Sequence, residues 1–167
     1  MNDKNDDAVE KMVHAYEVML ERVNDFSDRA APVLGNAINH ARETAVELGE
    51  LTREEADKVA NYIERDIKDA ATFIVETGED FREWFAFDVQ LVETKLFDMF
   101  ASAADQTSLE LQKFSEAAKR ASYLHTGEIT GPGTVACVAC GERLNFKKAG
   151  HIPPCPKCHT TEFKRVR

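Results

Sequence analysis

The first three-quarters of the chain carries apolar residues at helical spacing. They recur at intervals of three and four residues, with charged residues between them, which is typical of amphipathic helices. The first stripe comprises Val9, Met12, Val13, Tyr16, Leu20 and Val23. A second stripe spans residues 34–48 and stops before Gly49. Its cap is expected at Ser27 or Asp28, with Pro32 in its first turn.

Three more helices are predicted before residue 125. Thr52 and Glu55 form the capping-box pattern, so a long helix is expected to begin there. An aromatic-rich fourth helix is expected over residues 80–100, and a shorter fifth one after a cap at Thr107 or Ser108. Narrow apolar stripes on long helices are buried most simply in an antiparallel bundle or an elongated coiled-coil hairpin. The fold class is therefore predicted to be mainly α.

The composition changes after Thr126. Five of the eight glycines, four of the five prolines and all four cysteines lie beyond it. Residues 127–167 hold seven bases and three acids, a net charge of +4, against -13 for residues 1–126. Short alternating segments in the later part predict β-strands. The sequence therefore predicts an acidic, coiled-coil-like helical region at residues 1–125 and a small C-terminal β region at residues 126–167.

The cysteines of this β region follow the pattern C-x2-C-x14-C-x2-C. The candidate ligands are Cys137, Cys140, Cys155 and Cys158. Two intervening residues let a tight turn direct both sulfurs of a pair to one point, and Gly141 can supply the positive φ that the chain needs there. Four thiolates with no other ligand type favour one structural Zn²⁺ in a closed tetrahedral site. Metal binding would contribute about 10–16 kcal/mol to a region with too few apolar residues for its own core. We therefore expect residues 126–167 to form a zinc ribbon.

The cysteines also have alternative uses. The same sulfurs could hold iron in a rubredoxin-like centre, pair as disulfides, or act as redox Cys-x-x-Cys motifs. Disulfides need an oxidising compartment, and a redox pair belongs at the junction of a strand and a helix, so zinc is favoured over both. His151 and His159 are additional candidate ligands.

The helical region shows no catalytic constellation. A di-metal site of the ferritin type needs Glu-x-x-His, and His14, His40 and His125 all lack a glutamate three residues earlier. The acidic pairs Glu54-Glu55 and Glu79-Asp80 lie at helix starts, where carboxylates meet the positive end of the helix dipole. The sequence is 43% apolar and 31% charged, with no secretory signal and no apolar run long enough to span a membrane. We therefore expect a cytoplasmic protein that is not an enzyme.

These motifs together resemble the YbeL-like zinc-ribbon-containing proteins of bacteria, a small family of unknown function. The resemblance rests on Gly49-Glu50-Leu51-Thr52-Arg53 between two long helices, on Thr126-Gly127-Glu128, on both cysteine pairs and on the basic C-terminal strand with Phe163. It covers nearly the whole chain and implies a helical N-terminal arm followed by a ribbon in which the four cysteines match one for one. His159 departs from the glycine expected after the second pair.

Three hypotheses for function follow. The leading one is a zinc-binding, non-enzymatic adaptor, monomeric or dimeric, whose helices contact a protein partner. The first alternative is a nucleic-acid-binding ribbon associated with transcription or translation. Its candidate residues are Lys147, Lys148, Lys164, Arg165 and Arg167 beside Phe146 and Phe163. The second alternative is thiol redox or metal sensing at the cysteines. The opposite charges of the two regions also suggest that they dock on each other, so that salt would increase protease access to residues 125–132.

Overall fold

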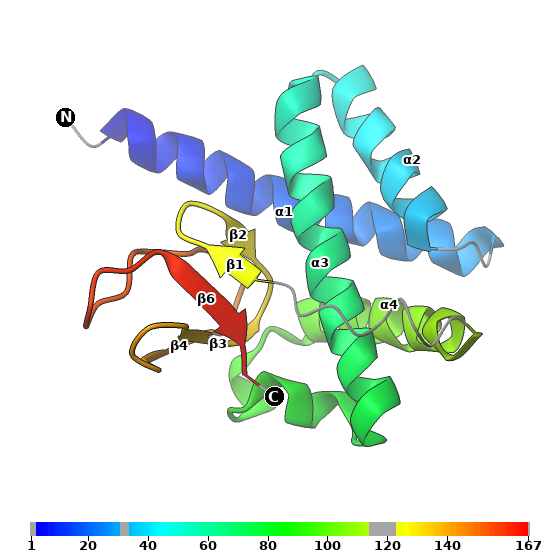
Figure 1. The fold of residues 1–167 in the computed structure, drawn as a ribbon. Helices are drawn as coiled ribbons and strands as arrows, with labels where there is room; N and C mark the ends of the chain where they lie inside the picture. The colour runs from blue at the N-terminus through cyan, green and yellow to red at the C-terminus, as the bar shows by residue number, and fades with distance from the viewer. Residues whose placement is uncertain (1–2, 31–33, 114–122, 167) are drawn as a thin grey trace.

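The helices of the protein pack across one another in the first two-thirds of the chain. The computed structural model describes residues 3–30, 34–113 and 123–166. These residues contain four α-helices, α1 (Asp3–Ala30), α2 (Leu34–Glu47), α3 (Arg53–Thr77) and α4 (Thr94–Lys113), and two 3-10 helices, η1 (Phe81–Phe85) and η2 (Val89–Leu91). The central helix α3 contacts the other three α-helices (Figure 1). Together the helices form the helical arm (residues 3–113).

The sequence of α3 explains both of its ends and its buried face. The Thr52 hydroxyl accepts a hydrogen bond from the Glu55 N–H at 3.2 Å, and the Glu55 carboxylate accepts one from the Thr52 N–H at 2.9 Å. The predicted capping box is thus confirmed. Gly78 ends the helix in the left-handed conformation, with φ of 68°, which costs glycine little. The fully buried face includes Val59, Ile63 and Ile67.

The predicted start of the second helix is wrong. α1 continues through Ser27 and Asp28 to Ala30, so neither residue caps a following helix. Ser27 is buried, so packing in the arm extends α1 past the polar residues that suggested a cap. α2 begins at Leu34, and Pro32 lies outside the described residues.

The predicted fourth helix is also wrong at its start. Asp80 caps the short η1, because its carboxylate accepts a hydrogen bond from the Arg82 N–H at 2.9 Å. Ala86 then ends η1 in the left-handed conformation, and α4 begins only at Thr94. The tight turn of η1 lets closely spaced rings pack in one cluster, which a longer α-helix would distribute around its surface. The cluster contains Phe81, Trp84, Phe85, Phe97 and Phe100.

The predicted start of a fifth helix at Thr107 or Ser108 is wrong, because both residues lie inside α4. α4 passes through Thr107 and Ser108 without a break. The Ser108 hydroxyl donates to the backbone carbonyl of Asp105 at 2.7 Å, which satisfies this polar side chain inside the helix. Residues 114–122, the remainder of the predicted fifth helix, lie outside the described residues.

The C-terminal residues form a small β region of two antiparallel sheets beside the arm (Figure 1). Its strands are β1 (Tyr123–His125), β2 (Ile129–Thr130), β3 (Gly133–Cys137), β4 (Arg143–Phe146), β5 (Gly150–His151) and β6 (Glu162–Arg165). Four of them pair in the order β1-β6-β3-β4, while β2 pairs with β5. This ribbon (residues 123–166) after a helical arm confirms the predicted fold class. The boundary between residues 125 and 126 stays a prediction; β1, which precedes it, pairs with β6.

The arm and the ribbon have cores of unequal size. The larger core fills the arm and includes Tyr16, Trp84 and Phe100, and the ribbon adds Ile129 and Ala149 to it. The buried residues of the ribbon's own core are Leu124, Val135, Cys137, Ile152, Cys155 and Phe163. The ribbon therefore lies against the arm and has few apolar residues of its own. Among the described helices, none is both long and apolar enough to cross a membrane.

Candidate metal centre

The four cysteines come together at one point of the ribbon. Cys137 ends β3 and Cys140 lies in the turn after it, while Cys155 and Cys158 lie in the loop between β5 and β6. All four sulfurs lie within 4.8 Å of one another. The Cys137 and Cys158 sulfurs are 3.5 Å apart, and the Cys140 and Cys155 sulfurs are 3.6 Å apart. These separations are much longer than a disulfide bond of about 2.0 Å.

The sulfur cluster fits a tetrahedral zinc ion. Zn–S bonds of about 2.3 Å in a regular tetrahedron place neighbouring sulfurs about 3.8 Å apart, close to both observed separations. Four sulfurs also complete the ligand set of a structural zinc site. In the described part of the chain, no second cluster of histidine, cysteine, aspartate or glutamate side chains has this arrangement. His151 and His159, the two additional candidates, are not members of the cluster.

The two cysteine pairs have the same local backbone geometry. The Gly141 N–H donates to the carbonyl of Cys137, and the His159 N–H donates to that of Cys155, each at 2.9 Å. Gly141 has φ of 76° and His159 has φ of 62°, so both turns end in the left-handed conformation. The positive φ expected for Gly141 is confirmed. His159 adopts it as a residue with a Cβ, which is uncommon and strained.

Thr160 contacts two of the sulfurs, which the sequence analysis did not predict. The only hint in the sequence is its position two residues after the second cysteine pair. Its hydroxyl lies 3.0 Å from the sulfurs of both Cys137 and Cys158. This hydrogen bond lowers the pKa of Cys137 to about 6. The Glu142 N–H lowers the pKa of Cys140, but burial and the neighbouring thiols raise it more, to about 12. Four thiols this close cannot all ionise unaided, whereas a divalent cation compensates their charge.

Comparison with known proteins agrees with this geometry. Residues 21–167 match a protein family described as a zinc-ribbon containing domain. The chain belongs to this zinc-ribbon family. It is 27% identical over 128 residues to the uncharacterized protein YbeL of Escherichia coli K12, covering 77% of this chain and 79% of YbeL. YbeL of Escherichia coli O157:H7 matches equally. The predicted resemblance to the YbeL-like family is thus confirmed, and no solved structure matches the chain.

The zinc-ribbon chain also contains a buried polar cluster between arm and ribbon, which the sequence did not predict. Its centre is Asp66 of α3, which is fully buried. The hydroxyl of Tyr16 and the N–H of Gly131 each donate to Asp66 Oδ2 at 2.7 Å. Arg165 Nη2 and Arg65 Nε donate to Oδ1 at 2.8 and 3.0 Å. Burial alone would raise the pKa of Asp66, but the charges of Arg65 and Arg165 hold it below its ordinary value.

Arg165 is the ribbon's main contribution to this cluster. Its side chain is only 2% exposed. Besides Asp66, its guanidinium lies 3.6 Å from Asp69 and 4.7 Å from the centre of the Trp84 ring. The Trp84 indole N–H donates to Asp69 at 3.1 Å. A single ribbon side chain thus joins two carboxylates of α3 to the aromatic cluster of the arm.

Gly131 and Gly133, on either side of Pro132, lie where side chains of the arm and of Arg165 leave no room for a Cβ. A Cβ at Gly131 would come within 2.7 Å of the Tyr16 hydroxyl and 3.0 Å of the Phe100 ring. A Cβ at Gly133, where φ is 145°, would come within 2.7 Å of Arg165 Nη1. Gly131 therefore lets the ribbon backbone rest directly on the arm, and Gly133 leaves room for the Arg165 side chain.

Some of the residues predicted for nucleic-acid binding are buried in the folded protein, and others are exposed. Arg165 is committed to Asp66, and Phe163 lies fully buried in the ribbon core. The exposed candidates are Lys147, Lys148 and Lys164. Phe146 is half-buried, and Arg167 lies outside the described residues.

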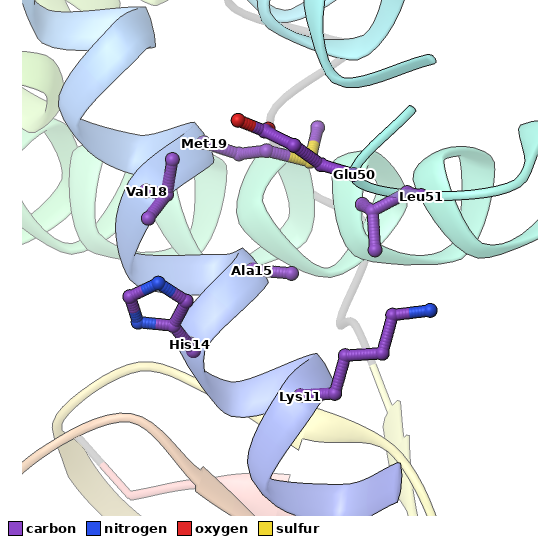
Figure 2. Close-up of a pocket in the computed structure, with 7 residues that line it drawn as sticks. All are labelled: Lys11, His14, Ala15, Val18, Met19, Glu50 and Leu51. Atoms are coloured by element: carbon purple, nitrogen blue, oxygen red, sulfur yellow. The ribbon is translucent and has the colours of Figure 1, made fainter. Parts of the chain in front are cut away.

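A small cavity lies between α1 and the connection from α2 to α3. Figure 2 shows its lining, which consists of Lys11, His14, Ala15, Val18, Met19, Glu50 and Leu51. Glu50 pairs with Arg22 at 2.6 Å, and Lys11 pairs with Glu55 at 3.0 Å. The cavity measures about 150 Å³, below the roughly 300–1,000 Å³ of typical small-molecule sites. We assign no ligand to it, because its ionised groups already pair with protein groups and its volume is small.

Proposed function

We propose that the protein is a non-enzymatic interaction protein in which Cys137, Cys140, Cys155 and Cys158 hold one structural Zn²⁺. The convergence of the four sulfurs within 4.8 Å carries this proposal. A cation with four thiolate ligands has no open position for water or substrate, which favours a structural role over a catalytic one. The ribbon's small core supports the same role, because so few buried side chains do not hold a fold of this length by themselves.

The buried carboxylates of the arm support a non-enzymatic role as well. Asp66 and Asp69 are the acids that burial would best prepare for acid–base chemistry. Asp66 already accepts hydrogen bonds from Tyr16, Gly131 and two arginines, and Asp69 accepts one from Trp84. A substrate has no access to these oxygens while the ribbon is docked. The cluster therefore serves to join arm and ribbon.

Partner binding is assigned to the outer faces of the arm. The apolar stripes of α1 and α3 are covered within the chain, since residues such as Leu20 and Ile63 are fully buried. The outer faces are predominantly acidic, as the charge of -13 over residues 1–126 implies. A protein with a basic surface would complement them. Nucleic-acid binding has less support, because Arg165 and Phe163 are buried. Thiol redox chemistry has less support, because all four sulfurs meet at one point.

The zinc proposal is tested by elemental analysis of the purified full-length protein. We expect one zinc per chain, and we expect Cys155→Ser to lose it, because three thiolates bind the ion much less tightly than four. His151→Gln is the matched control and should keep the metal, since His151 is outside the sulfur cluster. Iron in place of zinc, or absence of metal with oxidised cysteines by thiol labelling, would contradict the proposal. Capture of one specific partner, lost on reversing charges of the arm, would test the interaction role.

A further inference from the structure

The arm contains a pocket shaped for a guanidinium group. We call Asp66, Asp69 and Trp84 the guanidinium pocket. All three belong to the arm, and arm side chains contact both carboxylates: Tyr16 of α1 donates to Asp66, and Trp84 of η1 donates to Asp69. The ribbon adds the Gly131 N–H, which also donates to Asp66. Two carboxylates beside the face of an indole suit a planar, delocalised cation better than a compact ammonium.

Arg165 fills this pocket from the ribbon. Its Nη2 donates to Asp66 at 2.8 Å, and its guanidinium lies over the Trp84 ring. Its Nε and Nη1 atoms make no hydrogen bond within the described residues. The pocket therefore holds this group by one strong hydrogen bond, by charge and by stacking, and not by a complete set of hydrogen bonds.

The metal centre determines where Arg165 lies. Arg165 is opposite Val135 in the pairing of β6 with β3, and two residues earlier Phe163 is opposite Cys137. At its start, β6 follows directly on the turn of Cys158 and Thr160, whose side chains are 3.0 Å apart. Both strands that set the position of Arg165 thus continue into the cysteine cluster.

We propose that the metal state of the cysteine cluster controls the guanidinium pocket. With metal bound, β6 keeps Arg165 in the pocket and Gly131-Pro132-Gly133 covers Tyr16 and Phe100. Without metal, the ribbon loses its fixed strands, Arg165 leaves, and the pocket is open to a guanidinium group from another molecule, such as an arginine side chain. The inference rests on the proposed zinc site, since it assigns that site a regulatory consequence.

Trp84 reports this change directly, because it is the single tryptophan of the chain and is fully buried. The full-length protein is treated with a chelator, and released zinc is quantified in the same sample. We expect zinc release to shift Trp84 emission to longer wavelength and to increase acrylamide quenching several-fold, while far-UV circular dichroism keeps its helical signal. Zinc release with unchanged Trp84 emission would overturn the inference. Loss of the helical signal together with zinc would also overturn it, because the arm would then unfold rather than open.

An Arg165→Met variant separates the pocket from the metal site. We expect it to keep its zinc and yet to show the emission shift, whereas the neighbouring exposed Lys164→Met should resemble the wild type. In an Arg165→Ala variant, whose short side chain leaves the space of the guanidinium vacant, added ethylguanidinium should reverse the shift, and ethylammonium at the same concentration should not. An unshifted emission, or equal reversal by both cations, would overturn the proposal of a pocket specific for guanidinium. A wild type that purifies without metal would instead refute the zinc proposal, and the Arg165→Met result would still decide the pocket.

If Arg165→Met does not fold, Arg165→Lys provides the same test with the charge retained. It should keep its zinc and still shift Trp84 emission, because an ammonium stacks poorly on an indole. The shift should be smaller than the one that chelation causes, because the ribbon stays docked. Emission identical to that of the wild type would count against a pocket specific for guanidinium.

Discussion

At the scale of single residues, the two cysteine turns show how local sequence sets local geometry. Gly141 and His159 occupy equivalent positions and share the left-handed conformation. Glycine adopts it without cost, whereas a side chain with a Cβ pays about 1–2 kcal/mol. Histidine is among the residues that tolerate it best. The second turn is therefore the more strained of two otherwise similar metal-binding turns.

Substitutions at His159 should reveal this strain. We expect His159→Val to reduce the unfolding free energy of the metal-bound protein by about 1–2 kcal/mol, because a β-branched residue tolerates positive φ poorly. His159→Gly should stay within about 1 kcal/mol of the wild type, since the strain relieved is offset by the greater freedom of glycine in the unfolded chain. Thermal or urea unfolding at full zinc loading measures both. Equal stability of the valine and glycine variants would contradict a strained turn.

At the scale of elements, the docking of the β2–β3 connection on α1 and α4 depends on backbone approach. Gly131 lies against Tyr16 of α1 and Phe100 of α4, and its own N–H donates to Asp66 of α3. Three helices therefore meet one short stretch of ribbon backbone. Side chains cannot replace this contact, because a single added carbon would overlap the Tyr16 hydroxyl.

Two glycine-to-alanine substitutions test this contact as a matched pair. Gly131→Ala should reduce the unfolding free energy by about 1–3 kcal/mol, because the new methyl group overpacks a closed interface. Gly35→Ala, on the exposed face of α2 with no atom within 4 Å of the new carbon, should be neutral or stabilising by up to about 1 kcal/mol. Chemical unfolding of the zinc-loaded proteins measures both values. A neutral Gly131→Ala would show that the ribbon can move away from the arm at little cost.

At the scale of the whole molecule, the arm and the ribbon dock through a buried cluster and not through their overall charges. The opposite net charges correctly suggested docking, but the main ionic contact, Arg165 with Asp66, is almost completely buried. Salt screens exposed charges much more than buried ones. We therefore expect salt to change protease access less than the sequence suggested.

Limited proteolysis near residues 125–132 distinguishes docking through the buried cluster from docking through exposed charges. We expect the zinc-loaded protein to be cleaved there at the same rate at low salt and at about 1 M salt, where the screening length is only about 3 Å. Chelation at low salt should accelerate cleavage, and this sample serves as the positive control. Faster cleavage at high salt with zinc fully retained would mean that exposed charges hold the two parts together.

Local signals made several parts of the structure predictable. The spacing of Cys137, Cys140, Cys155 and Cys158 gave the metal-binding turns, because each pair is fixed by hydrogen bonds within a few residues. The capping box at Thr52 is likewise complete within four residues. The boundaries near Ser27 and residues 107–108 were wrong, because packing of side chains from distant segments outweighed weak local caps. Asp80 does cap a helix, but it is the short η1 and not the long α-helix expected there.

The sequence by itself therefore determined the mainly α character of the arm, the ribbon and the convergence of four cysteines, since helical periodicity and ligand spacing are local properties. Only the tertiary structure decided that Arg165 belongs with Asp66, because 99 residues separate them and no local pattern links one arginine to one aspartate. The pairing of β6 with β3 places Arg165, and its contact with Asp66 exists only when the ribbon is folded against the arm.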